Sequence, residues 1–296
     1  MQITVFSIKR QDQAGSHLTL ASSLASIDQV AALNANVLVD LVSAMRHGPS
    51  FNGDRPFYRD RRGTINYLDS NFFRCIAAIG TDSSHWRTVV KSASHPLVRA
   101  SLAQNTRVLA IDRKLIVWQS RHDESPIVRE AAKSNLSGRP MSARNIKGIS
   151  PAVAELSVAY LTLLRQLHHL ACARLAIISQ IQELSAVLRA VPKEIVDTVN
   201  NQLTQMHDYD NRVVNTINAL LPKLQSVIFI MRQVDNAIAI QEHLVDLNNS
   251  AAGLAIADLP NIMIDAVQEI NRLHQDANIR MDSVSAYSYM NITTGA

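Results

Sequence analysis

One short segment combines guanidinium groups with aromatic rings, and its members are Arg55, Phe57, Tyr58, Arg59, Arg61 and Arg62. Arginine side chains pair with phosphate groups, and flat rings stack on unpaired bases. The same chemistry suits the headgroups of anionic lipids. The segment therefore predicts contact with RNA or another polyanion, or with an anionic membrane surface. The alternatives are a solvated basic face and a surface that docks on another protein.

The charge of the surrounding chain supports a polyanionic partner. Residues 46–149 carry 18 Lys and Arg against 8 Asp and Glu, and they hold 8 of the 14 aromatic residues. Residues 151–296 have the opposite balance, with 9 Lys and Arg against 14 Asp and Glu. The two halves therefore have different electrostatic partners, or they attract each other.

Arg174 and Asp210 are each the lone charge in a stripe of apolar residues at heptad spacing. Both lie eighteen residues from Pro192, where the residue before the proline disfavours helix. If the chain folds back at Pro192, Leu167 faces Ile217 and the two charges meet. The pattern predicts a structural ion pair that fixes the register of two helices, with a switch as the functional alternative. Removal of Asp210 is expected to cost roughly 3–5 kcal/mol, as for other broken buried pairs.

His168 and Cys172 have the i, i+4 spacing that lets two side chains share a metal ion. His169 lies beside them, and His207 and Asp208 lie near the same level on the second arm of the expected hairpin. No third and fourth ligand are near in sequence, so solvated histidines are the preferred interpretation. We therefore expect no metal and no cofactor.

Enzyme signatures are missing from the sequence. It has no glycine-rich phosphate loop, no GxSxG, no HExxH and no CxxC motif. Ser84-His85 and His122-Asp123 are neighbours in sequence, but a catalytic triad needs a third group in space. We therefore predict a protein that is not an enzyme and infer no small-molecule substrate.

Composition and the absence of targeting motifs indicate where in the cell the protein is expected. The chain has only two cysteines, no signal-peptide pattern and no run of about 18 uninterrupted apolar residues. These features favour a cytoplasmic protein without transmembrane helices, with leaderless export left open.

The elements that must position these residues are mainly helical. We predict a mainly α fold, a long antiparallel helical hairpin or coiled-coil bundle with N- and C-terminal helices and a basic mixed insert. The expected organisation is a strand and bundle helix at 1–47, the insert at 48–149, the hairpin with a last helix at 150–282, and a tail at 283–296. Within it we expect a strand at 2–8, a helix at 17–46, short helices near 71–80 and 97–120, a linker at 134–149, hairpin arms at 151–191 and 193–247, and a helix from 260.

Three local features sharpen this layout. Ser150-Pro151 is a typical helix start. Pro222 should kink or split the second arm. The run 107–118 fits a helix or a strand equally well.

Apolar residues outside the main stripes need cover from further helices or from other subunits, and they are Ala186, Val187, Val214, Ile228, Ile230 and Ile240. We therefore hypothesise a non-enzymatic structural or assembly protein that forms homo-oligomers, whose insert contacts nucleic acid or a neighbouring subunit. One alternative is a membrane-active, pore-forming helical bundle. The other is an RNA-binding protein that oligomerises through the hairpin.

Overall fold

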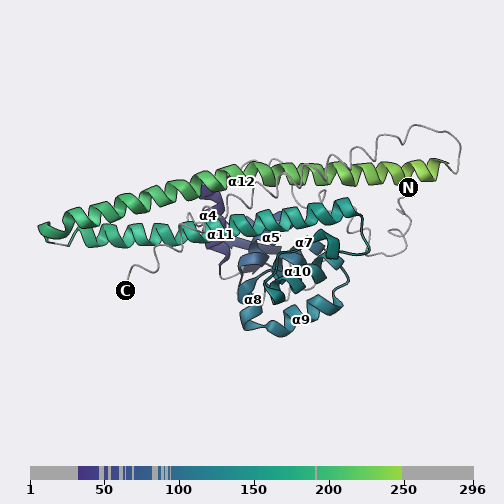
Figure 1. The fold of residues 1–296 in the computed structure, drawn as a ribbon, viewed down its shortest axis with the longest axis horizontal. Helices are drawn as coiled ribbons and strands as arrows, with labels where there is room; N and C mark the ends of the chain where they lie inside the picture. Colours follow the sequence, from purple (N-terminus) through teal and green to yellow (C-terminus); the bar gives the residue numbers. More distant parts are fainter. Residues whose placement is uncertain are drawn as a thin grey trace.

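The computed structural model shows a mainly helical protein with one small sheet (Figure 1). It describes residues 33–46, 50–52, 55–59, 63, 65–68, 70–81, 86–87, 90, 93, 95–190 and 192–248. The predicted strand at 2–8, the predicted helix from 260 and the tail at 283–296 lie outside these residues, as does the first part of the predicted helix at 17–46.

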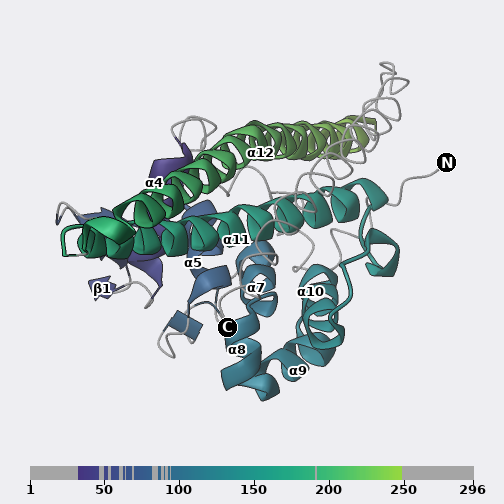
Figure 2. The same cartoon turned by 60° about the vertical axis from the view of Figure 1, so that its left-hand side comes forward.

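The two longest helices are α11, Pro151–Leu188, and α12, Lys193–Asn248. The start of α11 is as predicted, because the Ser150 side chain accepts from the Val153 amide at 3.5 Å and Pro151 occupies the first turn. Helix α11 ends at Leu188 and α12 begins at Lys193, and the helices lie side by side near these ends in both views (Figures 1 and 2). The apolar stripes provide their contact, and Leu167, Ile217 and Leu224 are buried.

Pro222 does not split α12, which continues through it to Asn248. Leu221 and Leu224, next to the proline in sequence, are buried. This packing holds the helix together although the proline cannot donate a backbone hydrogen bond. Figure 1 shows the axis of α12 changing direction along its length, as expected for a helix with an internal proline.

Helix α4, Ala35–Met45, crosses the two long helices. It begins at Asn34, whose side chain accepts from the amides of Asn36 and Val37 at 3.0 and 3.1 Å. A single helix over 17–46 is therefore wrong at Asn34, because its extended backbone makes it an N-cap. Leu38, Leu41 and Met45 of α4 are buried.

The insert starts with a three-stranded antiparallel sheet of β1, Ser50–Asn52, β2, Arg55–Arg59, and β3, Ile65–Tyr67. Its helices are α5, Asn71–Gly80, α7, Pro96–Ala103, α8, Thr106–Ile111, α9, Arg113–His122, and α10, Pro126–Ser137, followed by the 3-10 turn η1, Ala143–Asn145. The predicted helix at 71–80 is confirmed. The short helices predicted near 97–120 are α7, α8 and α9, and the ambiguous run 107–118 is helical apart from a break at Asp112.

Buried amides join the helices of the insert. Asn105 caps α8, and its Nδ2 donates to the carbonyls of Ala78 and Thr81 at 2.9 and 2.7 Å. Asn135 Nδ2 donates to Ala103 O at 2.8 Å. The hydrophobic core is continuous from the insert into α11, because Phe72, Trp86 and Tyr160 belong to one buried cluster. The insert thus packs directly on the face of α11 that α12 leaves uncovered.

Candidate functional site

The structure brings Arg174 and Asp210 together in a two-point ion pair. Arg174 Nε donates to Asp210 Oδ1 at 2.8 Å and Nη2 donates to Oδ2 at 3.4 Å. Arg174 Nη1 also donates to Asn36 Oδ1 at 2.7 Å, a partner that the sequence analysis missed. The side chains of Arg174 and Asp210 are 11% and 20% exposed. One guanidinium group therefore links α4, α11 and α12.

A second buried ion pair was not predicted. Arg99 of α7 donates from Nε and Nη2 to the two carboxylate oxygens of Asp123 at 3.1 and 3.2 Å. The same guanidinium donates to Ala93 O at 2.6 Å and to Glu124 Oε1 at 2.9 Å. Asp123 also accepts from the Ser125 amide at 2.9 Å, at the start of α10. The one sequence feature that could have drawn attention to Asp123 is its position just before Ser125-Pro126, because a serine followed by a proline commonly starts a helix.

The predicted basic and aromatic segment forms β2, but its residues do not share one surface. Phe57 packs edge-on against Tyr67 of β3, with ring centroids 6.0 Å apart. Tyr58 points to the opposite face, as successive strand residues must, and packs against the core. Arg59 is exposed. The backbone of Arg55 pairs with Asn52, and Arg61 and Arg62 lie outside the described residues.

A second basic surface on α9 escaped the sequence analysis. Lys114, Trp118, Arg121 and His122 are exposed, and the rings of Trp118 and His122 are 6.1 Å apart. Trp118 is 44% exposed, which is unusual for so large an aromatic side chain. The i, i+4, i+7 spacing of Lys114, Trp118 and Arg121 was a usable signal once the run 107–118 is taken as helix. We call these four residues the α9 face.

His168 and Cys172 lie close together, with Nε2 and Sγ 3.7 Å apart. Burial lowers the pKa of His168 to about 4 and raises the pKa of the Cys172 thiol. His169, His207 and Asp208 are exposed. Across the part of the chain that the structure describes, no three His, Cys, Asp or Glu side chains gather closely enough for a metal ion.

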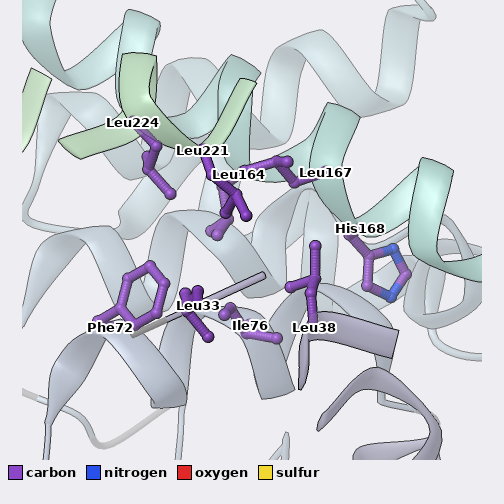
Figure 3. A pocket seen from close by; sticks show the side chains of 9 residues that line it. All are labelled: Leu33, Leu38, Phe72, Ile76, Leu164, Leu167, His168, Leu221 and Leu224. Carbon is purple, nitrogen blue, oxygen red and sulfur yellow. The ribbon is translucent and has the colours of Figure 1, made fainter. Parts of the chain in front are cut away.

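His168 lines two cavities. One is a small void among apolar side chains of α4, α5, α11 and α12, with His168 at its edge (Figure 3). The other is a pocket of about 310 Å³ that His168 also lines. We call it the α11 pocket, and it is lined by Val42, Arg46, Gly80, Arg107, His168, Cys172, Leu175, Ala176 and Ser179.

Cys75 contrasts with Cys172. It is fully buried on α5, beside Ser101 and Tyr160, and burial raises the pKa of its thiol to about 12. A buried, protonated thiol is inert toward alkylating reagents. Cys75 is therefore a packing residue, whereas Cys172 lines a pocket.

Interpretation of these sites rests on the chemistry of the chain itself. No protein-family model, no curated protein and no solved structure matches this sequence.

Proposed function

We propose that this chain is a non-enzymatic structural protein that self-associates through an antiparallel hairpin formed by α11 and α12. The short distance in sequence between the end of α11 at Leu188 and the start of α12 at Lys193 supports the hairpin, as does the Arg174–Asp210 pair. The part that self-associates is the projecting arm, defined as residues 175–188 of α11 and 193–212 of α12. Figure 1 shows this end of the two helices extending beyond the helices of the insert.

The observation that carries the proposal is the apolar surface on the α11 part of the projecting arm; residues 193–212 of α12 contain six charged residues. Among the arm residues with described side chains, none in 175–188 is buried, and in 193–212 only Val199 is. Residues 175–188 contain one charged residue, Glu183. Val187 and Ile195 are each 46% exposed. A solvated helix normally carries a charged outer face, so this surface is suited to contact with protein.

A second copy of the chain is the simplest cover for this surface. Two helices in contact leave much of each apolar face exposed, and two hairpins packed together form a four-helix bundle that buries it. Burial contributes roughly 25 cal/mol per Å² of apolar area. The homo-oligomer is therefore the expected state in solution. The free thiols Cys75 and Cys172 fit assembly in a reducing cytoplasm.

Substitutions that introduce charged side chains into the projecting arm should abolish this association. We expect the purified chain to form a discrete oligomer, and the Val187→Glu/Ile195→Glu variant to be a monomer with unchanged helix content. Multi-angle light scattering after size exclusion, together with far-UV circular dichroism, measures both properties. The matched control is Val37→Glu on α4, at an apolar site that is 44% exposed, and it should leave the oligomer intact. A wild-type chain that is monomeric at micromolar concentrations contradicts the proposal.

A membrane-active protein is the second candidate, and one observation favours it. Two helical segments, Pro151–Leu188 and Ile195–Arg232, are long and apolar enough to cross a membrane by length and composition, and only 17% of the apolar window in the first is buried. Core helices of proteins that never enter a membrane pass the same test. Release of dye from anionic liposomes by a chain that is monomeric in buffer would favour this candidate over assembly.

For the insert we propose contact with single-stranded RNA or a similar polyanion. The α9 face supports this proposal, because Lys114 and Arg121 flank an exposed Trp118 on which a base can stack. Phe57 and Arg59 of β2 form a smaller set of the same kind. The alternative partner for both surfaces is a neighbouring subunit.

Substitutions on the α9 face should weaken RNA binding. We expect Trp118→Ala to cost roughly 1–3 kcal/mol of binding free energy, the usual contribution of one base stack. Lys114→Gln/Arg121→Gln should also reduce the salt dependence of binding, because fewer counterions are released. Fluorescence anisotropy with a labelled oligonucleotide measures both effects at several salt concentrations. Phe57→Ala/Arg59→Gln tests β2 in the same assay, and equal affinity for all variants would rule out these surfaces.

A further inference from the structure

We propose that the α11 pocket binds the phosphate group of a small phosphate-bearing molecule. The pocket lies where the ends of α4 and α5 and the start of α8 meet the middle of α11. Its volume of about 310 Å³ is at the lower end of the range for small-molecule sites. This inference does not depend on RNA binding, because none of its lining residues belongs to the α9 face or to β2. Three lining residues, Leu175, Ala176 and Ser179, also belong to the projecting arm, but binding of an anion does not require the arm to self-associate.

The charge of the pocket selects an anion. Arg46 and Arg107 both line it, and neither guanidinium group makes a hydrogen bond or ion pair with any residue that the structure describes. No aspartate or glutamate is among the lining residues. His168, Cys172 and Ser179 complete the polar lining. Cys172 Sγ lies 3.7 Å from His168 Nε2, and the Ser179 hydroxyl donates to Glu183 Oε1 at 3.4 Å, so an anion would take over these donors. Two arginines with donors and no carboxylate match the needs of a phosphate group.

Both arginines influence the same thiol. Arg107 and Arg46 both lower the pKa of the Cys172 thiol, against the larger opposite effect of burial. Arg107 also contributes to the lowered pKa of His168, after burial and His169. A thiol influenced by two guanidinium groups marks a site of positive potential. An anion bound there gains from both charges at once.

Gly80, at the end of α5, shapes the pocket, because a Cβ at this position would overlap His168 Nε2. The glycine thus allows the imidazole to lie against the end of α5 and form one wall of the pocket. The end of α5 is held by Asn105, whose Nδ2 donates to the carbonyls of Ala78 and Thr81 at 2.9 and 2.7 Å.

Protection of Cys172 from alkylation tests the proposal. We expect inorganic phosphate to slow the reaction of Cys172 with iodoacetamide by roughly tenfold at about ten times its Kd, when compared with chloride at the same ionic strength. Peptide mass spectrometry measures the rate at each cysteine. Cys75 is the internal control, because it is fully buried and should react only after unfolding. No slowing, or equal slowing by chloride at the same ionic strength, overturns the proposal.

Two double variants that lose the same charge test whether protection of Cys172 by phosphate arises in the α11 pocket. Arg46→Gln/Arg107→Gln should abolish the protection by phosphate. Arg139→Gln/Arg144→Gln removes two exposed arginines that do not line the pocket, and it should keep the protection. Equal protection in the two variants contradicts the proposed site. A parallel titration with acetate decides the ligand class, and protection by acetate equal to that by phosphate would overturn the assignment of a phosphate in favour of a carboxylate.

Discussion

Replacement of Asp123 by alanine should lower the free energy of unfolding by about 4 kcal/mol, because it leaves a buried guanidinium without its main partner. The side chains of Arg99 and Asp123 are 6% and 4% exposed, so water cannot replace the lost carboxylate. The variant also loses the hydrogen bond from the Ser125 amide at the start of α10. Urea denaturation followed by far-UV circular dichroism measures the change.

Glu124 provides a matched control for this prediction. It accepts from the same guanidinium at 2.9 Å, but its side chain is 47% exposed. Glu124→Ala should therefore cost less than about 1 kcal/mol, as expected for a solvated ion pair. The double variant Arg99→Met/Asp123→Leu should be milder than Asp123→Ala, because it leaves no unpaired buried charge. An equal decrease in the free energy of unfolding for Asp123→Ala and Glu124→Ala would show that the burial of the carboxylate does not determine the loss of stability.

Features that repeat along the chain were predictable from the sequence. The heptad stripes indicated that Leu167 and Ile217 are core residues, and both are buried. The same repeat indicated which two charges meet, since Arg174 and Asp210 occupy equivalent places in the two stripes. The helix start at Ser150-Pro151 could be predicted because a helix start depends on residues that are adjacent in sequence. Each of these signals is local or periodic, so one sequence is sufficient to find it.

Contacts between segments that do not share a heptad repeat could not be predicted from the sequence. Arg99 and Asp123 meet because α7 packs beside the turn between α9 and α10, and nothing in their spacing indicates that arrangement. Asn36 reaches Arg174 only because α4 crosses α11. The α11 pocket combines four elements in the same way. The sequence analysis grouped Tyr58 with the arginines for a simpler reason. Successive side chains of a strand point to opposite faces, whereas in a loop they could share one surface.

Removal of the Asp210 carboxylate is expected to destabilise the chain by about 3 kcal/mol, near the lower end of the range for broken buried pairs. The Arg174 and Asp210 side chains are 11% and 20% exposed, so water compensates part of the lost charge. Arg174 also keeps its hydrogen bond to Asn36 Oδ1 at 2.7 Å. Urea denaturation of Asp210→Ala at neutral pH gives the value. A loss near zero would mean that the guanidinium finds enough water or other partners to replace the carboxylate.

Two comparisons separate an ordinary ion pair from one that fixes the register of α11 against α12. Asp208→Ala removes an exposed carboxylate two residues away and should change stability by less than about 0.5 kcal/mol. Arg174→Met/Asp210→Leu replaces both charges with apolar groups and should be close to the wild type in stability. If the pair fixes the register, this double variant should still lose the single oligomeric state of the wild type in light scattering, because an uninterrupted apolar seam allows the helices to slide and re-pair. Retention of one unchanged oligomer would assign the pair to stability alone, since the apolar stripes would then define the register without it.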